Sequence, residues 1–104
     1  TVHVPRRPYV EALPGIPTIR PFEALACGIP LVSAPWRDDE HLFTAGADYL
    51  VARDGGEMIR QLRAVLADDG LATELAAHGR ETVLARHTCA HRVDELLSLL
   101  EELP

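Results

Sequence analysis

A helix that ends on a glycine and passes at once into a strand most limits how this chain can fold. Residues 20–27 (RPFEALAC) favour a helix with a proline in its first turn, where the missing proline N–H leaves no hydrogen bond unmade. Gly28 fits the left-handed residue that commonly ends a helix. Residues 29–34 (IPLVSA) follow directly as a short apolar strand, and Pro35 ends it. So short a connection indicates layered α/β structure.

Two other short apolar segments repeat this pattern. Residues 1–4 (TVHV) are largely β-branched and precede a proline, which favours a strand. Residues 49–52 (YLVA) are continuously apolar, as is typical of a strand buried on both faces of a parallel sheet.

The segments between these strands contain helix breakers and capping residues. Residues 6–18 hold three prolines and a glycine, so we expect mainly loop there, with a helical turn near residues 9–13. Asp38 or Asp39 is expected to cap a brief helix that runs through Phe43 and ends at Gly46.

The chain after residue 52 is predicted to be helical. Apolar residues recur at helical spacing in residues 57–67 and 71–86, and Thr88 is placed to cap a last helix. The apolar face of that last helix consists of Val93, Leu96, Leu97 and Leu100. Three strands correspond to half of a doubly wound sheet. The helical part after residue 52 is long compared with so small a sheet. The sequence therefore predicts a Rossmann-like three-layer fragment, with a short parallel sheet of about three strands and a long helical C-terminal part.

Composition excludes several classes of function. Ten Lys+Arg against sixteen Asp+Glu give a net charge of −6, the wrong sign for a nucleic-acid binder. No apolar run reaches the roughly 20 residues of a membrane span. Two cysteines are too few for a disulfide framework, and we expect a cytoplasmic location. The 104 residues begin inside an apolar run without Met, so we expect one domain of a longer protein.

The loop that leads into the first long helix is the best candidate for a ligand site. Ligands of open α/β sheets lie at the carboxyl ends of strands, near the starts of the following helices, and residues 15–20 (GIPTIR) occupy such a place. The N–H groups at a helix start attract phosphate, and Arg20 could add a charged donor. Glu23 could accept hydrogen bonds from the two hydroxyls of a ribose. On spacing alone, Glu23 could equally complement the helix dipole, and Arg20 could be a solvated surface cation.

Other residues of chemical interest are better explained by structure. His87, Cys89 and His91 include zinc-ligand types, but Cys89 would point away from the histidines, and a cap at Thr88 is the simpler account, so no metal site is predicted. Trp36 is expected to be a packing residue and not a platform for a ligand, and Cys27 to be a small buried residue. His3 and His78 have no partner that the sequence can name, and structural roles are preferred for both.

Residues 20–32 (RPFEALACGIPLV) resemble the donor-site motif of group 1 glycosyltransferases. In that family a Glu, small residues, Cys-Gly and a Pro-led apolar strand recur at this spacing. The arginine ahead of Phe-Glu is closest to the CgeB-type (spore-maturation-like) branch. Further matches in residues 42–46 and 79–92 extend the resemblance over essentially the whole chain.

The resemblance implies that residues 1–104 are part of the C-terminal, nucleotide-sugar-binding domain of a GT-B glycosyltransferase. Glu23 matches the glutamate that binds the ribose, and Thr18, Ile19 and Arg20 match the loop that meets the diphosphate and sugar. Arg6 or Arg7 would reach the phosphates. No metal or other cofactor is required by this reading.

The catalytic base and the acceptor site would lie in an N-terminal domain outside these residues. No catalytic residue is therefore predicted within the fragment, which alone is expected to bind nucleotide weakly and to be inactive.

One position departs from the family pattern. Group 1 enzymes pair two glutamates eight positions apart, and the earlier position is Gly15 in this chain. A carboxylate contact to the donor sugar, and the stereochemical outcome with it, is not predicted.

Two other functions remain open on the sequence. A non-catalytic α/β module would associate with another chain, or with a second copy of itself, through the C-terminal helices. A receiver-like regulatory domain is a weaker alternative, because that fold uses a lysine near its end and this sequence contains no lysine.

Overall fold

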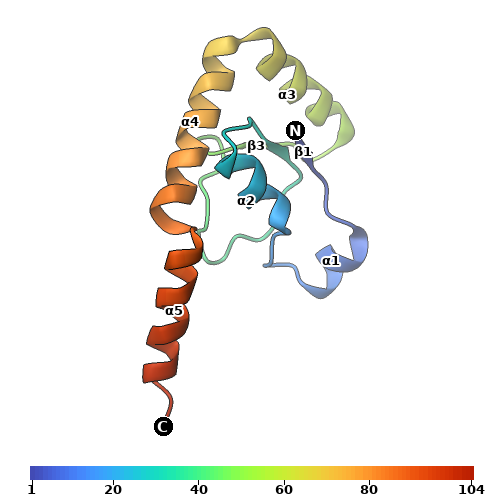
Figure 1. Ribbon diagram of the computed structural model, residues 1–104. Coiled ribbons are helices and arrows are strands. Elements are labelled where there is room, and N and C mark those ends of the chain that lie inside the picture. The colour runs from blue at the N-terminus through green and yellow to red at the C-terminus, as the bar shows by residue number, and fades with distance from the viewer.

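Three short parallel strands form the centre of the fold. The computed structural model describes residues 1–104 and is shown in Figure 1. β1 (Val2–His3), β2 (Val32–Ser33) and β3 (Leu50–Val51) form one sheet in the order β1-β2-β3. Val32 is paired with Val2 on one side and with Leu50 on the other, so the three strands end at the same edge.

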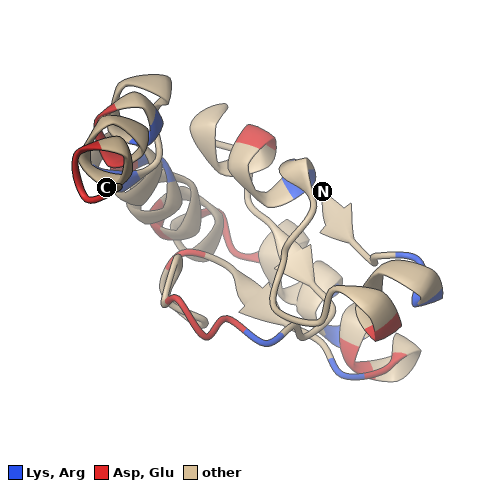
Figure 2. Cartoon of the chain, turned by 90° about the horizontal axis from the view of Figure 1, so that it is seen from below, with Lys and Arg blue, Asp and Glu red and all other residues tan.

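Helices surround this sheet. They are α1 (Arg7–Ala12), α2 (Ile19–Ala26), α3 (Gly55–Ala67), α4 (Asp69–Arg86) and α5 (Cys89–Glu101). Figures 1 and 2 place α2 on one face of the sheet and α3 on the other, while α4 runs alongside and contacts both of these helices. The predicted three-stranded, Rossmann-like α/β fragment with a long helical C-terminal part is confirmed.

The connection from α2 to β2 has the predicted geometry. Gly28 adopts a φ of +68°, which a side chain would disfavour, and its N–H donates to the Leu25 carbonyl oxygen at 3.0 Å. The chain then enters β2 within four residues. This tight turn brings the start of α2 to the edge where the strands end.

The predicted helix from Asp38 to Phe43 is wrong. The Asp38 carboxylate does accept from the backbone N–H groups of Leu42 at 2.9 Å and Phe43 at 3.0 Å. However, His41 has a φ of +52°, in the left-handed region, so no helical turn continues through it. The aspartate therefore stabilises an irregular loop instead of capping a helix.

The core lies between α2, the sheet and α4. Leu25 and Leu31 are fully buried, and Phe43, Tyr49 and Val83 pack in the same cluster. Tyr49 also stacks on Trp36, with ring centroids 5.0 Å apart, so Trp36 packs at the edge of the core as predicted.

Close contact between α4 and α2 occurs at Gly79. A Cβ atom there would lie 2.7 Å from a Leu25 methyl group and 2.9 Å from the carbonyl oxygen of Asp48. Only glycine lets the two helices approach this far.

Four parts of the molecule lie outside the fully buried core: Cys27, β3, α1 and α5. Cys27 is exposed, because it lies at the C-terminal end of α2 and not within the core, so its predicted burial is wrong. β3 is an edge strand, and Leu50 and Val51 are only half-buried. Neither α1 nor α5 contains a buried residue, and α5 projects away from the sheet in Figure 1. No helix has the length and apolar character needed to cross a membrane.

Candidate functional site

A cavity of about 610 Å³ lies where β1 ends and α2 begins. β1 supplies His3, the loop after it supplies Arg6, and the start of α2 supplies Ile19 and Arg20, with Thr18 just before it. The remaining lining residues are Val4, Pro5, Tyr9, Leu13, Ile16 and Pro17. The structure therefore brings four of the six predicted site residues to one cavity, namely Thr18, Ile19, Arg20 and Arg6.

His3 ties three elements together beneath this cavity. Its side chain is almost fully buried, with its Nδ1 atom 2.9 Å from the Ser33 hydroxyl and its Nε2 atom 2.9 Å from the Thr18 hydroxyl. Ser33 belongs to β2 and Thr18 is the N-cap of α2. The imidazole thus fixes the start of α2 against the ends of two strands.

The hydrogen bonds and the lowered pKa together define the charge of this imidazole. The Ser33 hydroxyl donates to the Ala34 carbonyl oxygen at 2.7 Å, so it accepts from the His3 Nδ1–H group. Burial lowers the pKa of His3, and the nearby positive charge of Arg20 lowers it further, so the neutral form is favoured. In that form Nε2 carries no proton and accepts from the Thr18 hydroxyl, which itself accepts from the Arg20 N–H at 3.4 Å.

The rim of the cavity carries two unpaired cations. Arg6 and Arg20 are exposed, and neither guanidinium lies within ion-pair distance of a carboxylate. The start of α2 adds the positive end of the helix dipole. Although positive and negative residues are interspersed along the chain (Figure 2), the local field at this rim favours an anion.

The two other predicted residues lie beside the cavity. Glu23 is one turn beyond Ile19 on the same face of α2, exposed, and without a hydrogen bond or ion pair from its carboxylate. Arg7 is the first residue of α1 and is also exposed. Neither residue lines the cavity itself.

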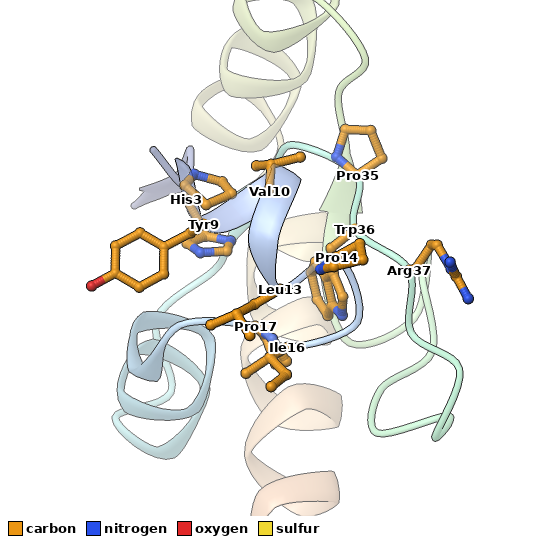
Figure 3. Close-up of a pocket in the computed structure, with 11 residues that line it drawn as sticks. His3, Tyr9, Val10, Leu13, Pro14, Ile16, Pro17, Pro35, Trp36 and Arg37 are labelled. Atoms are coloured by element: carbon orange, nitrogen blue, oxygen red, sulfur yellow. The ribbon is translucent and has the colours of Figure 1, made fainter. Parts of the chain in front are cut away.

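A second cavity, of about 370 Å³, adjoins the first and is nearly all apolar (Figure 3). Trp36 and Pro14 form one part of its wall, and Val10 and Leu13 of the α1 region form another. Six residues line both cavities: His3, Pro5, Tyr9, Leu13, Ile16 and Pro17. Sequence reasoning missed this cavity, because its walls come from segments that no motif links.

The side chains of His87 and His91 make hydrogen bonds to other groups of the protein. The His91 side chain completes a capping box with Thr88, whose hydroxyl lies 2.6 Å from His91 Nδ1, as the predicted N-cap at Thr88 implies. His87 donates from Nε2 to the Leu42 carbonyl oxygen at 2.7 Å, and its Nδ1 lies 2.6 Å from the Arg92 guanidinium. Burial lowers the pKa of His87, although the bond to Leu42 opposes that effect.

The sequence profile of the glycosyl transferase-like family matches residues 1–98, nearly the full chain. No significant match was found among curated proteins or among solved structures. Because the profile covers both the sheet and all of the cavity residues, the chain belongs to the glycosyl transferase-like family.

Proposed function

We propose that this member of the glycosyl transferase-like family binds the donor of a glycosyl transfer, a nucleotide-diphosphate sugar, at the start of α2. Family membership supports glycosyl transfer in general. The observation that carries the proposal is the cavity bounded by Arg6, Thr18, Ile19 and Arg20, at the carboxyl end of β1. Ligands of open α/β sheets occupy this position.

The diphosphate would lie at the rim of this cavity. Its two negative groups would meet the unpaired guanidinium groups of Arg6 and Arg20 and the Ile19 N–H at the start of α2. The next two positions offer no free N–H, because the Arg20 N–H donates to Thr18 and Pro21 has none. Bonds from arginine to phosphate are charge-assisted and can be bidentate, which also fixes orientation. Arg7 is close in sequence and could reach the same phosphates from outside the cavity.

The ribose would lie further along α2. Glu23 is on the same helix face as Ile19, and its carboxylate has no protein partner. A free carboxylate one turn beyond a bound diphosphate is placed to accept hydrogen bonds from two vicinal hydroxyls. The nucleoside would then extend away from β1, along the exposed surface of α2.

The reaction would need more than this chain supplies. No residue around the cavity is positioned by a hydrogen bond as a general base, since both nitrogen atoms of His3 are occupied. The proposed enzyme is therefore a GT-B glycosyltransferase of group 1 or its CgeB-type branch, with residues 1–104 as part of the donor domain. A separate N-terminal domain would bind the acceptor and supply the base. Neither a metal nor another cofactor enters this scheme.

Titration of the chain with UDP and GDP tests the donor site, with calorimetry as the readout. Arg20→Ala is expected to weaken binding by about ten-fold, the effect of losing one charge-assisted hydrogen bond worth roughly 1.4 kcal/mol. Glu23→Ala should weaken the binding of both nucleotides. It should not weaken the binding of inorganic pyrophosphate, which has no ribose. Arg63→Ala and Glu74→Ala are matched controls, because both residues are exposed on other helices and make no ion pair.

Two results would overturn parts of this assignment. Equal nucleotide affinity for the wild type and Glu23→Ala would remove the ribose role. Equal affinity for Arg20→Ala and Arg63→Ala would remove the diphosphate site from the start of α2.

A second candidate function rests on α5. Its apolar residues Val93, Leu96, Leu97 and Leu100 are each more than half exposed. A non-catalytic module would use this face to associate with another chain or with a second copy. A tight dimer in sedimentation equilibrium, together with no nucleotide affinity, would favour this function over the first.

A further inference from the structure

The buried His3 side chain has cations around it and no carboxylate. Arg20 of α2 is close enough to repel a positive charge on the ring, and Arg6 lines the same cavity. Arg37 stands on the far side of the second cavity (Figure 3), with its charge balanced in a salt bridge. Tyr9 of α1 is the other titratable residue of these walls, and no carboxylate side chain lines either cavity.

The lack of a negative group has a consequence for ligand binding. Burial disfavours the imidazolium form of His3, and Arg20 disfavours it further. An anion in the cavity would supply the counter-charge that the protein itself does not provide. Because a nearby opposite charge favours the charged form of a histidine, a bound anion would shift His3 toward its protonated form.

The Thr18 hydroxyl is placed to respond to this change. Its oxygen lies 2.9 Å from His3 Nε2 and also accepts from the Arg20 N–H. A hydroxyl has one proton to donate but can accept two hydrogen bonds. When Nε2 carries a proton, Thr18 accepts from it and must donate its own proton elsewhere. Thr18 lines the first cavity, so the oxygen of a phosphate bound there is a suitable acceptor.

We propose that His3 couples the binding of the donor diphosphate to the uptake of one proton. The proton comes from solvent and binds Nε2, and the Thr18 hydroxyl turns from His3 toward a phosphate oxygen. The Nδ1–H group remains bonded to Ser33 in both states, so the ring need not move. His3 is thus a positioning residue, because it acts on the ligand through Thr18. The inference rests on the proposed function, which identifies the anion as a diphosphate.

The affinity for a nucleotide sugar should then depend on pH. UDP-glucose and GDP-mannose are suitable probes, because both of their phosphates are esterified and keep the same charge from pH 7.5 to pH 5.5. Calorimetry in two buffers of different ionisation enthalpy gives the number of protons taken up on binding. We expect uptake of up to one proton, and an affinity that rises at least about three-fold over this range, within the limit of about ten-fold per pH unit for one proton.

His3→Asn tests the residue, and His41→Asn is the matched control. Asparagine cannot take up the proton, so the affinity of His3→Asn should be independent of pH. His41 is exposed, lies outside both cavities and has a φ of +52°, which asparagine tolerates. His41→Asn should therefore keep the pH dependence of the wild type. The same pH dependence in His3→Asn as in the wild type would overturn the inference.

Thr18→Val tests the hydroxyl, and Thr18→Ser is its control because serine keeps that group. At pH 5.5, Thr18→Val is expected to bind UDP-glucose or GDP-mannose about ten-fold more weakly than Thr18→Ser, the effect of one hydrogen bond to a charged group. Equal affinity of the two variants would show that no bond from Thr18 to the phosphate forms, and would overturn the coupling through Thr18.

The wild type provides a readout that does not depend on the folding of a variant. The ¹⁵N NMR signals of a histidine ring show which of its nitrogens carries a proton. In the free protein only Nδ1 of His3 should be protonated, whereas at pH 5.5 the complex should carry a proton on Nε2 as well. If a nucleotide sugar binds and Nε2 stays unprotonated, the inference is wrong and the donor site stands. If neither nucleotide sugar binds at any pH, the donor proposal fails and this inference fails with it.

Discussion

α4 and α1 differ sharply in how they pack against the rest of the molecule. α4 approaches α2 so closely at Gly79 that a methyl group would not fit. On α4, His78 and Thr82 also bind the fully buried Asp48, at 2.6 Å and 2.7 Å. α1 has no buried residue, and its apolar side chains face a cavity. The α4 side of the fold is therefore fixed by close packing. The apolar side chains on the α1 side remain available to contact a ligand.

The largest effect on the free energy of unfolding is expected from Gly79→Ala. The new methyl group would meet both a Leu25 side chain and the Asp48 backbone oxygen, and the backbone cannot move aside easily. We expect a loss of about 3 kcal/mol in the free energy of unfolding, measured by urea denaturation. Gly55→Ala is the matched control, because nothing lies within 4 Å of its Cβ position at the start of α3. Comparable losses in both variants would contradict a packed α4 side.

An intermediate effect on stability is expected at His3, whose side chain joins the ends of β1 and β2 to the start of α2. The pKa of His3 is lowered in the folded state, so below about pH 6.5 the unfolded chain takes up the proton more readily. Stability due to His3 is thus fully present above pH 6.5 and falls as the pH decreases toward the folded pKa, by at most about 1.4 kcal/mol per pH unit.

The measurement is the urea midpoint between pH 7.5 and 5.5, for the wild type and His3→Asn. The pH dependence should be shallower in the variant, with a remainder from His87, whose pKa is also lowered. An unchanged slope would mean that His3 is not the buried neutral group described above.

The smallest effect is expected from Thr88→Ala, at the N-cap of α5. Loss of a cap typically destabilises a helix by about 1 kcal/mol. Because α5 buries no residue, we expect fraying of α5, seen as lower helicity by circular dichroism, with little change in the global urea midpoint. A large shift of the midpoint would show that α5 is packed, and would weaken the contrast with α4.

The local features of this fold could be predicted from the sequence. Gly28 ends α2 because of its own backbone freedom, and Thr88 caps α5 through a residue three positions away. The predicted site residues Thr18, Ile19 and Arg20 are contiguous, so a single motif placed them together. Signals of this kind depend on residues that are close together in the sequence, so they can be predicted without the three-dimensional structure.

Features that join distant segments could not be predicted. His3 is 30 residues from Ser33, and Asp48 is 30 from His78, so their pairing depends on the completed fold. The only hint was composition, since a histidine inside an apolar strand and an aspartate beside another must find partners when buried. The loop at His41 was mispredicted because Asp38 binds the same backbone groups in a loop as in a helix cap.

The projecting α5 also changes how the chain moves in solution. The molecule measures 54 × 30 × 16 Å, with a radius of gyration of 15.1 Å. A compact domain of this length has a radius of gyration of about 13 Å. A monomer should therefore diffuse slowly for its mass and elute early from a sizing column, where it could be mistaken for a dimer. Light scattering or sedimentation equilibrium, which report mass independently of shape, will give the true state of association.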